Sequence, residues 1–151
     1  TKVLILDLDV HQGDGTIDIC KKYSSVYTCS IHSESNFPYE KKQGWIDESL
    51  PSSIGDDQYL ETLKQTLQSI HNQITPDIVL YDAGVDVFVN DKLGNLSLSF
   101  EGIKKRDHLV LNHYRKQHIP IATVIGGGYS KDHQELAERH SIIFETAIKY
   151  L

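Results

Sequence analysis

The stretch that decides the fold is Val3-Leu4-Ile5-Leu6-Asp7-Leu8-Asp9-Val10-His11-Gln12-Gly13-Asp14-Gly15. Its apolar start is typical of a buried strand and leads directly into two carboxylates and an imidazole at alternate positions. On a strand, Asp7, Asp9 and His11 would share one face, because side chains alternate across a strand. Such a polar face is costly unless a cation compensates for it. The glycines then turn the chain, so the pattern predicts a metal site at a strand end.

Composition and charge narrow the class of protein. The 151 residues are about the size of one domain, and the net charge of −6 disfavours nucleic acid as the main partner while suiting a lysine-bearing substrate. No apolar stretch approaches the roughly 20 residues that span a membrane, and no secretory signal is visible, so no membrane association is expected. Two cysteines outside any CxxC motif favour a reducing cytoplasmic compartment, or the nucleus in a eukaryote.

Apolar runs alternate with amphipathic stretches along the chain. Strands are expected at residues 3–8, 26–31, 77–81 and 119–125, and helices at 14–23, 57–74, 99–117 and 133–151, with Ser99 or Ser97 as an N-cap. Residues 33–54 and 83–98 are expected to be loops. This order predicts an α/β fold with a mainly parallel sheet, whose carboxyl ends carry the site.

Asp86 is the natural third ligand beside Asp9 and His11, because it follows the strand expected at residues 77–81. Two carboxylates and one imidazole leave open positions for water and a carbonyl oxygen, as catalytic zinc requires. Iron(II) suits the same ligands. An Asp-x-His pair also occurs as a hydrogen-bonded structural pair, so the spacing alone leaves both interpretations open.

Three further residues have two interpretations each. Asp7 and Asp14 could orient imidazoles from behind a metal, or serve as a buried ion-pair partner and a helix N-cap. Tyr129 follows three glycines that allow close backbone approach, and its hydroxyl could donate to a developing oxyanion. A packed surface aromatic is the other interpretation of Tyr129.

Two further polar features are expected to have structural rather than functional roles. The run at residues 104–108, Lys-Lys-Arg-Asp-His, is expected to be a solvated helix face. His32 is expected to be a loop histidine bonded to the backbone.

In order and spacing, three segments resemble the zinc-dependent histone deacetylase family. They are Asp7-Leu8-Asp9-Val10-His11-Gln12-Gly13-Asp14-Gly15, Tyr81-Asp82-Ala83-Gly84-Val85-Asp86 and Gly126-Gly127-Gly128-Tyr129. Gln12, Asn36-Phe37-Pro38 and residues 91–99 resemble most its class IV-type and bacterial branch. The resemblance implies an arginase/deacetylase-like three-layer fold and a metal-dependent amidohydrolase that removes acetyl-type acyl groups from lysine amides.

The resemblance also implies residue roles. The zinc ligands of the family are matched by Asp9, His11 and Asp86. Tyr129 matches the tyrosine that polarises the substrate carbonyl. Asp7 and Asp14 match carboxylates that hydrogen-bond two tandem catalytic histidines.

The family's structural potassium site is matched as well. Its ligands correspond to Ser30 and Ile31, with the backbone carbonyls of Asp7, Asp9 and His11.

One family motif is absent from this sequence. The family carries an adjacent His-His pair upstream of the Asp-x-Asp-x-His strand, and none of the eight histidines here is adjacent to another. We therefore expect residues 1–151 to be the carboxy-terminal portion of a single deacetylase-like domain, with an incomplete fold. The general base is then expected in the missing amino-terminal part, and the isolated chain is expected to catalyse little.

Two other functions stay open at this point. One is an amidohydrolase acting on acetylated polyamines or other small amides, because a fold does not fix a substrate. The other is a non-catalytic module that keeps the metal and an acyl-lysine groove but lacks the base.

Overall fold

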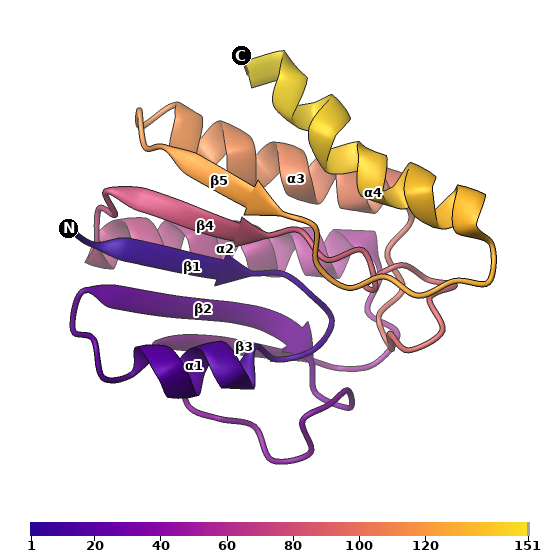
Figure 1. The fold of residues 1–151 in the computed structure, drawn as a ribbon, viewed down its shortest axis with the longest axis horizontal. Helices are drawn as coiled ribbons and strands as arrows, with labels where there is room; N and C mark the ends of the chain where they lie inside the picture. The colour runs from indigo at the N-terminus through magenta and orange to yellow at the C-terminus, as the bar shows by residue number, and fades with distance from the viewer. Residues whose placement is uncertain (151) are drawn as a thin grey trace.

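The computed structural model describes residues 1–150 and contains one sheet of five parallel strands (Figure 1). The strands are β1 (Val3–Asp7), β2 (Val26–Ser33), β3 (Ile46–Leu50), β4 (Ile78–Asp82) and β5 (Ile121–Val124), arranged in the order β3-β2-β1-β4-β5. The helices are α1 (Asp14–Cys20), α2 (Asp56–Gln73), α3 (Phe100–Arg115) and α4 (His133–Ala147), followed by the 3-10 helix η1 (Ile148–Tyr150).

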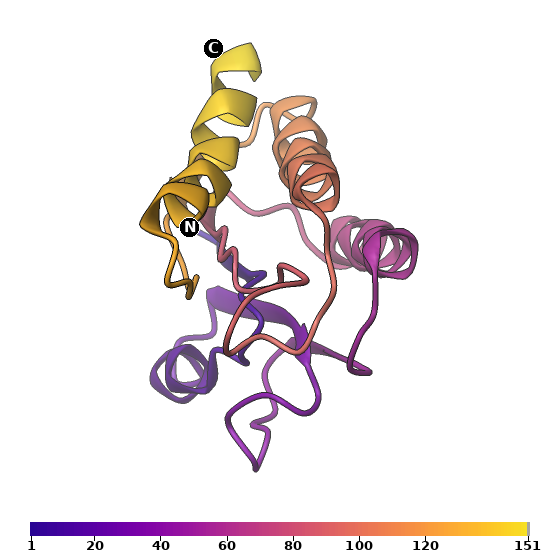
Figure 2. The same cartoon turned by 90° about the vertical axis from the view of Figure 1, so that its right-hand side faces the viewer.

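Helices lie on both faces of the sheet and make a three-layer fold, but one face is covered only in part, since Leu80 of β4 and Val124 of β5 are 40% and 58% exposed. The helices α2 and α3 lie on one face, and α1 and α4 on the other (Figure 2). The chain runs outward from β1 to β3 and then returns to place β4 on the other side of β1. The loops that leave β1 and β4 therefore start side by side, at the reversal point where doubly wound sheets place their sites. This confirms the predicted α/β class.

Burial explains why the apolar runs form these elements. Leu4 and Leu6 of the central strand β1 are completely buried, whereas Val3 and Ile5, which point to the opposite face, are half-buried. The helix α2 presents Leu63, Leu67 and Ile70 to the sheet at helical spacing. Ser99 caps α3, since its hydroxyl oxygen accepts a hydrogen bond from the Gly102 N–H at 3.0 Å, as predicted.

One predicted loop contains a strand. The sequence predicts four strands and a loop over residues 33–54, but Ile46–Leu50 form β3 at the edge of the sheet. Its Ile-Asp-Glu-Ser-Leu sequence lacks an apolar run, and Leu50 alone among its residues is buried. An edge strand pairs with only one neighbour and tolerates charged residues, which hides it from a search for buried strands.

Two further details concern helices. Asp14 is the first helical residue of α1 and Gly13 occupies the cap position, so the N-cap interpretation of Asp14 is wrong. Across residues 1–150, we find no helix with the length and apolar character needed to cross a membrane.

Candidate metal centre

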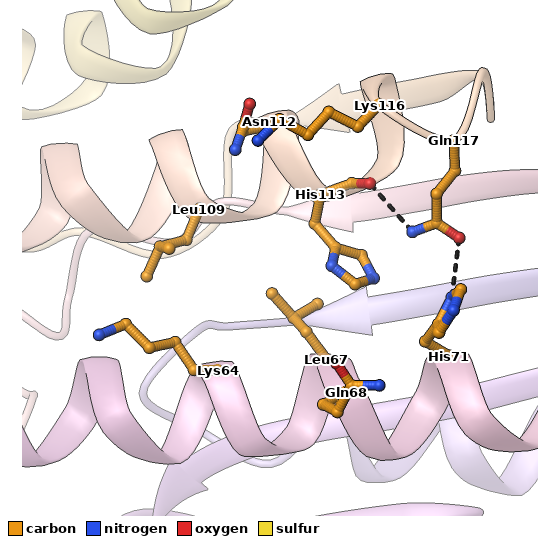
Figure 3. A pocket seen from close by; sticks show the side chains of 9 residues that line it. All are labelled: Lys64, Leu67, Gln68, His71, Leu109, Asn112, His113, Lys116 and Gln117. Carbon is orange, nitrogen blue, oxygen red and sulfur yellow. Dashed lines mark hydrogen bonds between the residues drawn. The ribbon is translucent and has the colours of Figure 1, made fainter.

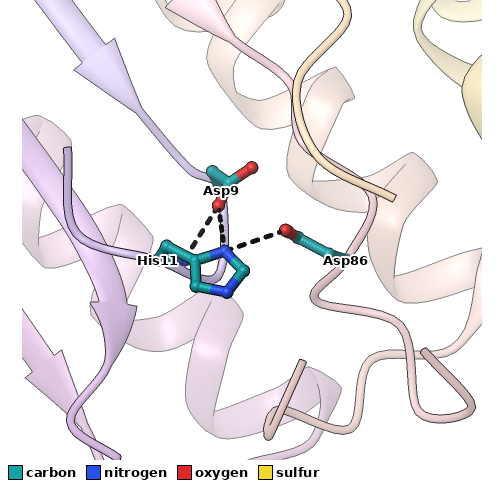
Figure 4. Close-up of side chains that lie close together, drawn as sticks. All are labelled: Asp9, His11 and Asp86. Carbon is teal, nitrogen blue, oxygen red and sulfur yellow. Dashed lines mark hydrogen bonds and ion pairs between the residues drawn. The ribbon is translucent and has the colours of Figure 1, made fainter. Parts of the chain in front are cut away.

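Three side chains from two loops converge at the carboxyl end of the sheet. Asp9 and His11 come from the loop after β1, and Asp86 comes from the loop after β4 (Figure 4). One potential ligand atom of each residue lies within 4.8 Å of the others. The His11 Nδ1 atom lies 2.9 Å from Asp9 Oδ1 and 3.2 Å from Asp86 Oδ2. The structure thus brings together all three residues that the sequence predicts as ligands.

The strand ends before the site begins. The sequence predicts Asp7, Asp9 and His11 on one strand face, but β1 ends at Asp7. The Oδ1 atom of Asp7 accepts a hydrogen bond from the Asp9 N–H at 3.1 Å, and Asp9 Oδ1 accepts one from the His11 N–H at 2.8 Å. Two successive aspartate turns therefore bend the chain, and they aim Asp9 and His11 at the β4 loop.

Burial and mutual hydrogen bonds shift the pKa values of all three groups. Asp86 is completely buried, and burial raises its pKa. Burial also opposes the charge of Asp9, but hydrogen bonds from the His11 side chain and backbone hold the pKa of Asp9 below its ordinary value. Hydrogen bonds to Asp86 and to Asp9 raise the pKa of His11 to about 10. In the metal-free protein, His11 is therefore an imidazolium at neutral pH.

These residues fit a divalent metal. Asp86 Oδ1 accepts a hydrogen bond from the Val10 N–H at 2.8 Å, whereas the buried Oδ2 has His11 Nδ1 at 3.2 Å and no well-aligned hydrogen bond. This oxygen and His11 Nδ1 face the same small volume, where a metal ion could replace the proton on the imidazole. The Gly127 N–H donates to Asp9 Oδ2 at 2.8 Å and so orients that carboxylate from behind.

Glycines make the close approach of these loops possible. A Cβ on Gly127 would overlap Asp86 Oδ2 and Asp9 Oδ2, and a Cβ on Gly84 would lie 2.7 Å from Asp9 Oδ2. No described glycine has a positive φ. The requirement at both positions is therefore for space beside the carboxylates, rather than for an unusual backbone conformation.

Asp7 lies behind the three candidate ligands. It pairs in register with Asp82 of β4, and burial together with the Asp82 charge raises the pKa of Asp7 well above its ordinary value. No cationic side chain of the described residues forms a salt bridge with Asp7, so the ion-pair interpretation is wrong. The roles of Asp7 and Asp14 toward catalytic histidines stay predictions.

Tyr129 stands at the edge of the site. Its ring lies 6.4 Å from the His11 ring, edge-on at 88°. Its backbone N–H donates to Asp91 Oδ2 at 2.7 Å, and the same oxygen accepts a hydrogen bond from Arg139 at 2.9 Å. Burial and the charges of Asp86 and Asp9 raise the pKa of Tyr129, so its hydroxyl stays protonated at neutral pH. The side chain is 41% exposed, which leaves it accessible to a ligand.

The predicted potassium ligands lie beside β1. Ser30 is buried and pairs in register with Asp7. Its hydroxyl is 3.0 Å from Nδ1 of His32, and Nε2 of His32 is 2.9 Å from the Ser49 hydroxyl. His32 is therefore a buried strand residue bonded to two hydroxyls, and its assignment to a loop and to backbone partners is wrong. Potassium binding at Ser30 and Ile31 stays a prediction.

The sequence patterns do not predict the burial of two arginines, Arg106 and Arg139. Arg106 and Asp107 are buried, so a solvated face at residues 104–108 is wrong for these two. The signal that could have found Arg106 is its helical spacing from Ile103 and Val110, which places it on the inner face of α3. Arg139 of α4 is also completely buried and donates to the Val85 carbonyl at 3.1 Å.

A separate groove lies between α2 and α3. It has a volume of about 370 Å³ and is crossed by a contact between His71 Nδ1 and Gln117 Oε1 at 2.9 Å (Figure 3). It is lined by residues of α2, of α3 and of the turn after α3. It includes none of the predicted site residues and is therefore separate from the candidate metal centre.

The chain is similar in sequence to a known domain family and to curated proteins. Residues 1–145 match the histone deacetylase domain family. An uncharacterized protein of Picosynechococcus sp. is 44% identical over 146 residues, which are 97% of this chain and 49% of that protein. Histone deacetylase 2 of Arabidopsis thaliana is 32% identical over 134 residues, 87% of this chain and 35% of that protein. The chain belongs to the histone deacetylase domain family and spans half or less of these relatives' length.

Solved structures share the fold. A structure described as an HDAC homologue complexed with SAHA aligns with a TM-score of 0.81 at 24% identity, over 97% of this chain and 41% of that chain. An acetylpolyamine aminohydrolase from Burkholderia pseudomallei aligns with a TM-score of 0.80 at 20% identity, over 96% and 44%. These similarities confirm the predicted deacetylase-like three-layer architecture.

Replacing Gly127 tests the requirement for space. Gly127→Ala is expected to lower the free energy of unfolding by about 1–3 kcal/mol, because the added methyl group displaces two carboxylates. The matched control is Gly15→Ala, since a Cβ on Gly15 meets nothing within 4 Å and Gly15 is an exposed helical residue. This control should raise stability by up to about 1 kcal/mol. Urea unfolding of both variants measures the difference, and equal stabilities would contradict the packing described above.

Zinc binding is expected to depend on pH through His11. The pKa of His11 is raised in the folded state, so its contribution to stability is fully present below the unfolded value of about 6.5 and is lost as the pH rises through about 10. Zinc must displace that proton, so the apparent affinity should rise about tenfold per unit between pH 7 and 8. Calorimetry in buffers of different ionisation enthalpy should detect one proton released. The exposed His133→Gln control should release the same number, whereas binding without proton release at pH 7 would contradict the raised pKa of His11.

Proposed function

We propose that this chain supplies the metal centre of a zinc-dependent hydrolase that removes acetyl-type acyl groups from lysine amides. Its main support is the convergence of Asp9, His11 and Asp86, one of them a fully buried carboxylate, in a chain that belongs to the histone deacetylase domain family. Two carboxylates and an imidazole suit Zn²⁺ and leave positions open for water and substrate. Fe²⁺ is accommodated by the same ligands.

The chain's own residues have distinct tasks in this proposal. A bound zinc ion would supply a Lewis acid that polarises the amide carbonyl and lowers the pKa of a water molecule. The Tyr129 hydroxyl donates a hydrogen bond to the oxyanion that forms when water adds to the carbonyl carbon. The amide C–N bond then breaks, and the lysine amine departs with a proton.

The proton of the attacking water needs a base beyond these 151 residues. The imidazole of His11 faces the two aspartates with Nδ1 and is committed to the metal, and no other histidine lies in the cluster of candidate ligands. We therefore propose that the remaining part of the same domain is the partner that brings the base. The net charge of −6 is compatible with lysine-rich substrates.

The direct test uses the full-length protein loaded with zinc, an acetyl-lysine peptide and an N-acetylated polyamine. Asp86→Asn keeps the shape of the side chain but removes the buried charge, so it should weaken zinc binding at least about tenfold and abolish hydrolysis. The control Asp57→Asn, an exposed residue of α2, should change neither property. Metal content and initial rates are the measurements.

The outcomes separate the alternatives. Hydrolysis of the polyamine alone would indicate a small-amide amidohydrolase. Zinc binding without hydrolysis of either compound would indicate a binding module. Normal zinc content and activity in Asp86→Asn would refute the metal centre itself.

Removal of the tyrosine hydroxyl separates catalysis from metal binding. Tyr129→Phe in the full-length protein should keep its zinc but lower kcat by about 10²–10³-fold, because one oxyanion donor is lost. Tyr23→Phe is the control, since Tyr23 is also exposed and precedes β2, at the amino end of the strands and away from the candidate site. Steady-state kinetics together with metal analysis measure the split, and an unchanged kcat would remove Tyr129 from the mechanism.

A further inference from the structure

Arg106 bridges the two loops that carry the candidate metal ligands. Its guanidinium group is completely buried. The Nη1 atom donates to the Gly84 carbonyl at 2.6 Å and the Leu8 carbonyl at 3.3 Å, and Nη2 donates to the Ala83 carbonyl at 3.2 Å. Leu8 directly precedes Asp9, and the two other carbonyls lie two and three residues before Asp86.

Within the described residues, Arg106 is the donor that joins the backbone carbonyls of the two loops. The last ladder bond between β1 and β4 runs from the Leu8 N–H to the Asp82 carbonyl, and beyond it the two strands no longer pair. No other described donor reaches the carbonyls of Leu8, Ala83 or Gly84. Val10 N–H also donates to Asp86 Oδ1 across the two loops at 2.8 Å, but on the side of the candidate ligands. The guanidinium group of Arg106 is therefore the link between the backbone carbonyls that precede them.

The guanidinium group is itself fixed. Its Nε atom donates to Asp107 Oδ1 at 2.9 Å, and the same oxygen accepts a hydrogen bond from the Tyr81 hydroxyl at 2.6 Å. Tyr81 belongs to β4, so the Arg106–Asp107 pair is tied to the strand that leads to Asp86. All three side chains are buried, which excludes water from these bonds.

Charge adds to geometry at this position. The cluster of Asp7, Asp9, Asp82 and Asp86 is a concentration of buried or half-buried carboxylates. Arg106 is a buried cation on the inner side of that cluster, and its charge stabilises the ionised form of Asp82. A neutral side chain at position 106 would leave the carboxylates with the His11 imidazole as their nearest cation.

We propose that Arg106 is a positioning residue for the metal centre, which sets the distance between Asp9 and Asp86 by holding the backbones before both. This inference rests on the proposed metal centre and adds a residue that does not touch the metal. The planar fork of an arginine explains the choice of residue. Nη1 reaches a carbonyl of each loop while Nη2 and Nε hold the Ala83 carbonyl and Asp107, whereas a lysine ammonium is a single point on a flexible chain and cannot make all of these bonds.

The test compares metal affinity with general stability in the full-length protein. Arg106→Lys keeps the charge but loses the fork, so it should raise the dissociation constant for Zn²⁺ about tenfold or more. It should also alter the visible spectrum of the Co²⁺-substituted protein, which reports ligand geometry. The matched control is Leu63→Ala, a truncation of a completely buried α2 residue outside both loops. Its zinc affinity and Co²⁺ spectrum should stay those of the unsubstituted protein despite a lower Tm.

Each result has one meaning. Unchanged affinity and spectrum in Arg106→Lys, or an equal loss of affinity in Leu63→Ala, would overturn the positioning role and leave the metal centre intact. Failure of the unsubstituted protein to bind Zn²⁺ or Co²⁺ would instead refute the proposed function. If Arg106→Lys does not fold, Tyr81→Phe decides, because it removes only the hydroxyl that anchors Asp107. A change of its Co²⁺ spectrum would support the role, and an unaltered spectrum and affinity would overturn it.

Discussion

The arrangement of this protein follows from the need to hold four carboxylates at one edge of a parallel sheet. They are Asp7, Asp9, Asp82 and Asp86. Burial and mutual repulsion raise the pKa of both residues that end the strands, Asp7 and Asp82. Two cationic side chains reduce this repulsion. His11 contacts Asp9 and Asp86 directly, and Arg106 binds the backbone that precedes them. Apolar residues would make this end of the sheet more stable, so the retention of carboxylates here supports the proposed cation site.

The glycines of this edge are a second response to the same crowding. Gly84 and Gly127 lie where any Cβ would press on a carboxylate oxygen, and the Gly127 N–H also holds one of those oxygens. Both glycines leave space for the carboxylates, and Gly127 also supplies a backbone N–H donor. The loop after β5 can therefore reach the loops after β1 and β4, and it carries Tyr129 with it. Asp91 and Arg139 hold the backbone of Tyr129 in turn, so the three loops form one connected unit.

Much of this organisation is predictable because its signals are local. Asp9 and His11 follow an apolar run, and a parallel sheet brings the loop that contains Asp86 to the same edge. The direction in which a charged side chain points is not local. Arg106 lies in a run of charged residues that suggests solvent exposure, while its partners lie 98 and 22 residues away along the chain. The strand β3 is missed for a related reason, because its pairing with β2, rather than its own composition, makes it a strand.

The order of the strands also determines when each part of the candidate site is synthesised. The central strand β1 pairs with β2, which follows it closely, and with β4, which follows only after β3 and α2 have been made. At about 5–20 residues per second, roughly 4–15 s separate the translation of Asp9 from that of Asp86. During this interval the nascent chain carries two of the three candidate ligands and one open side of its central strand. The β4 side of β1 stays unpaired until residues 78–82 have been made, and an unpaired strand edge offers backbone donors and acceptors to other chains.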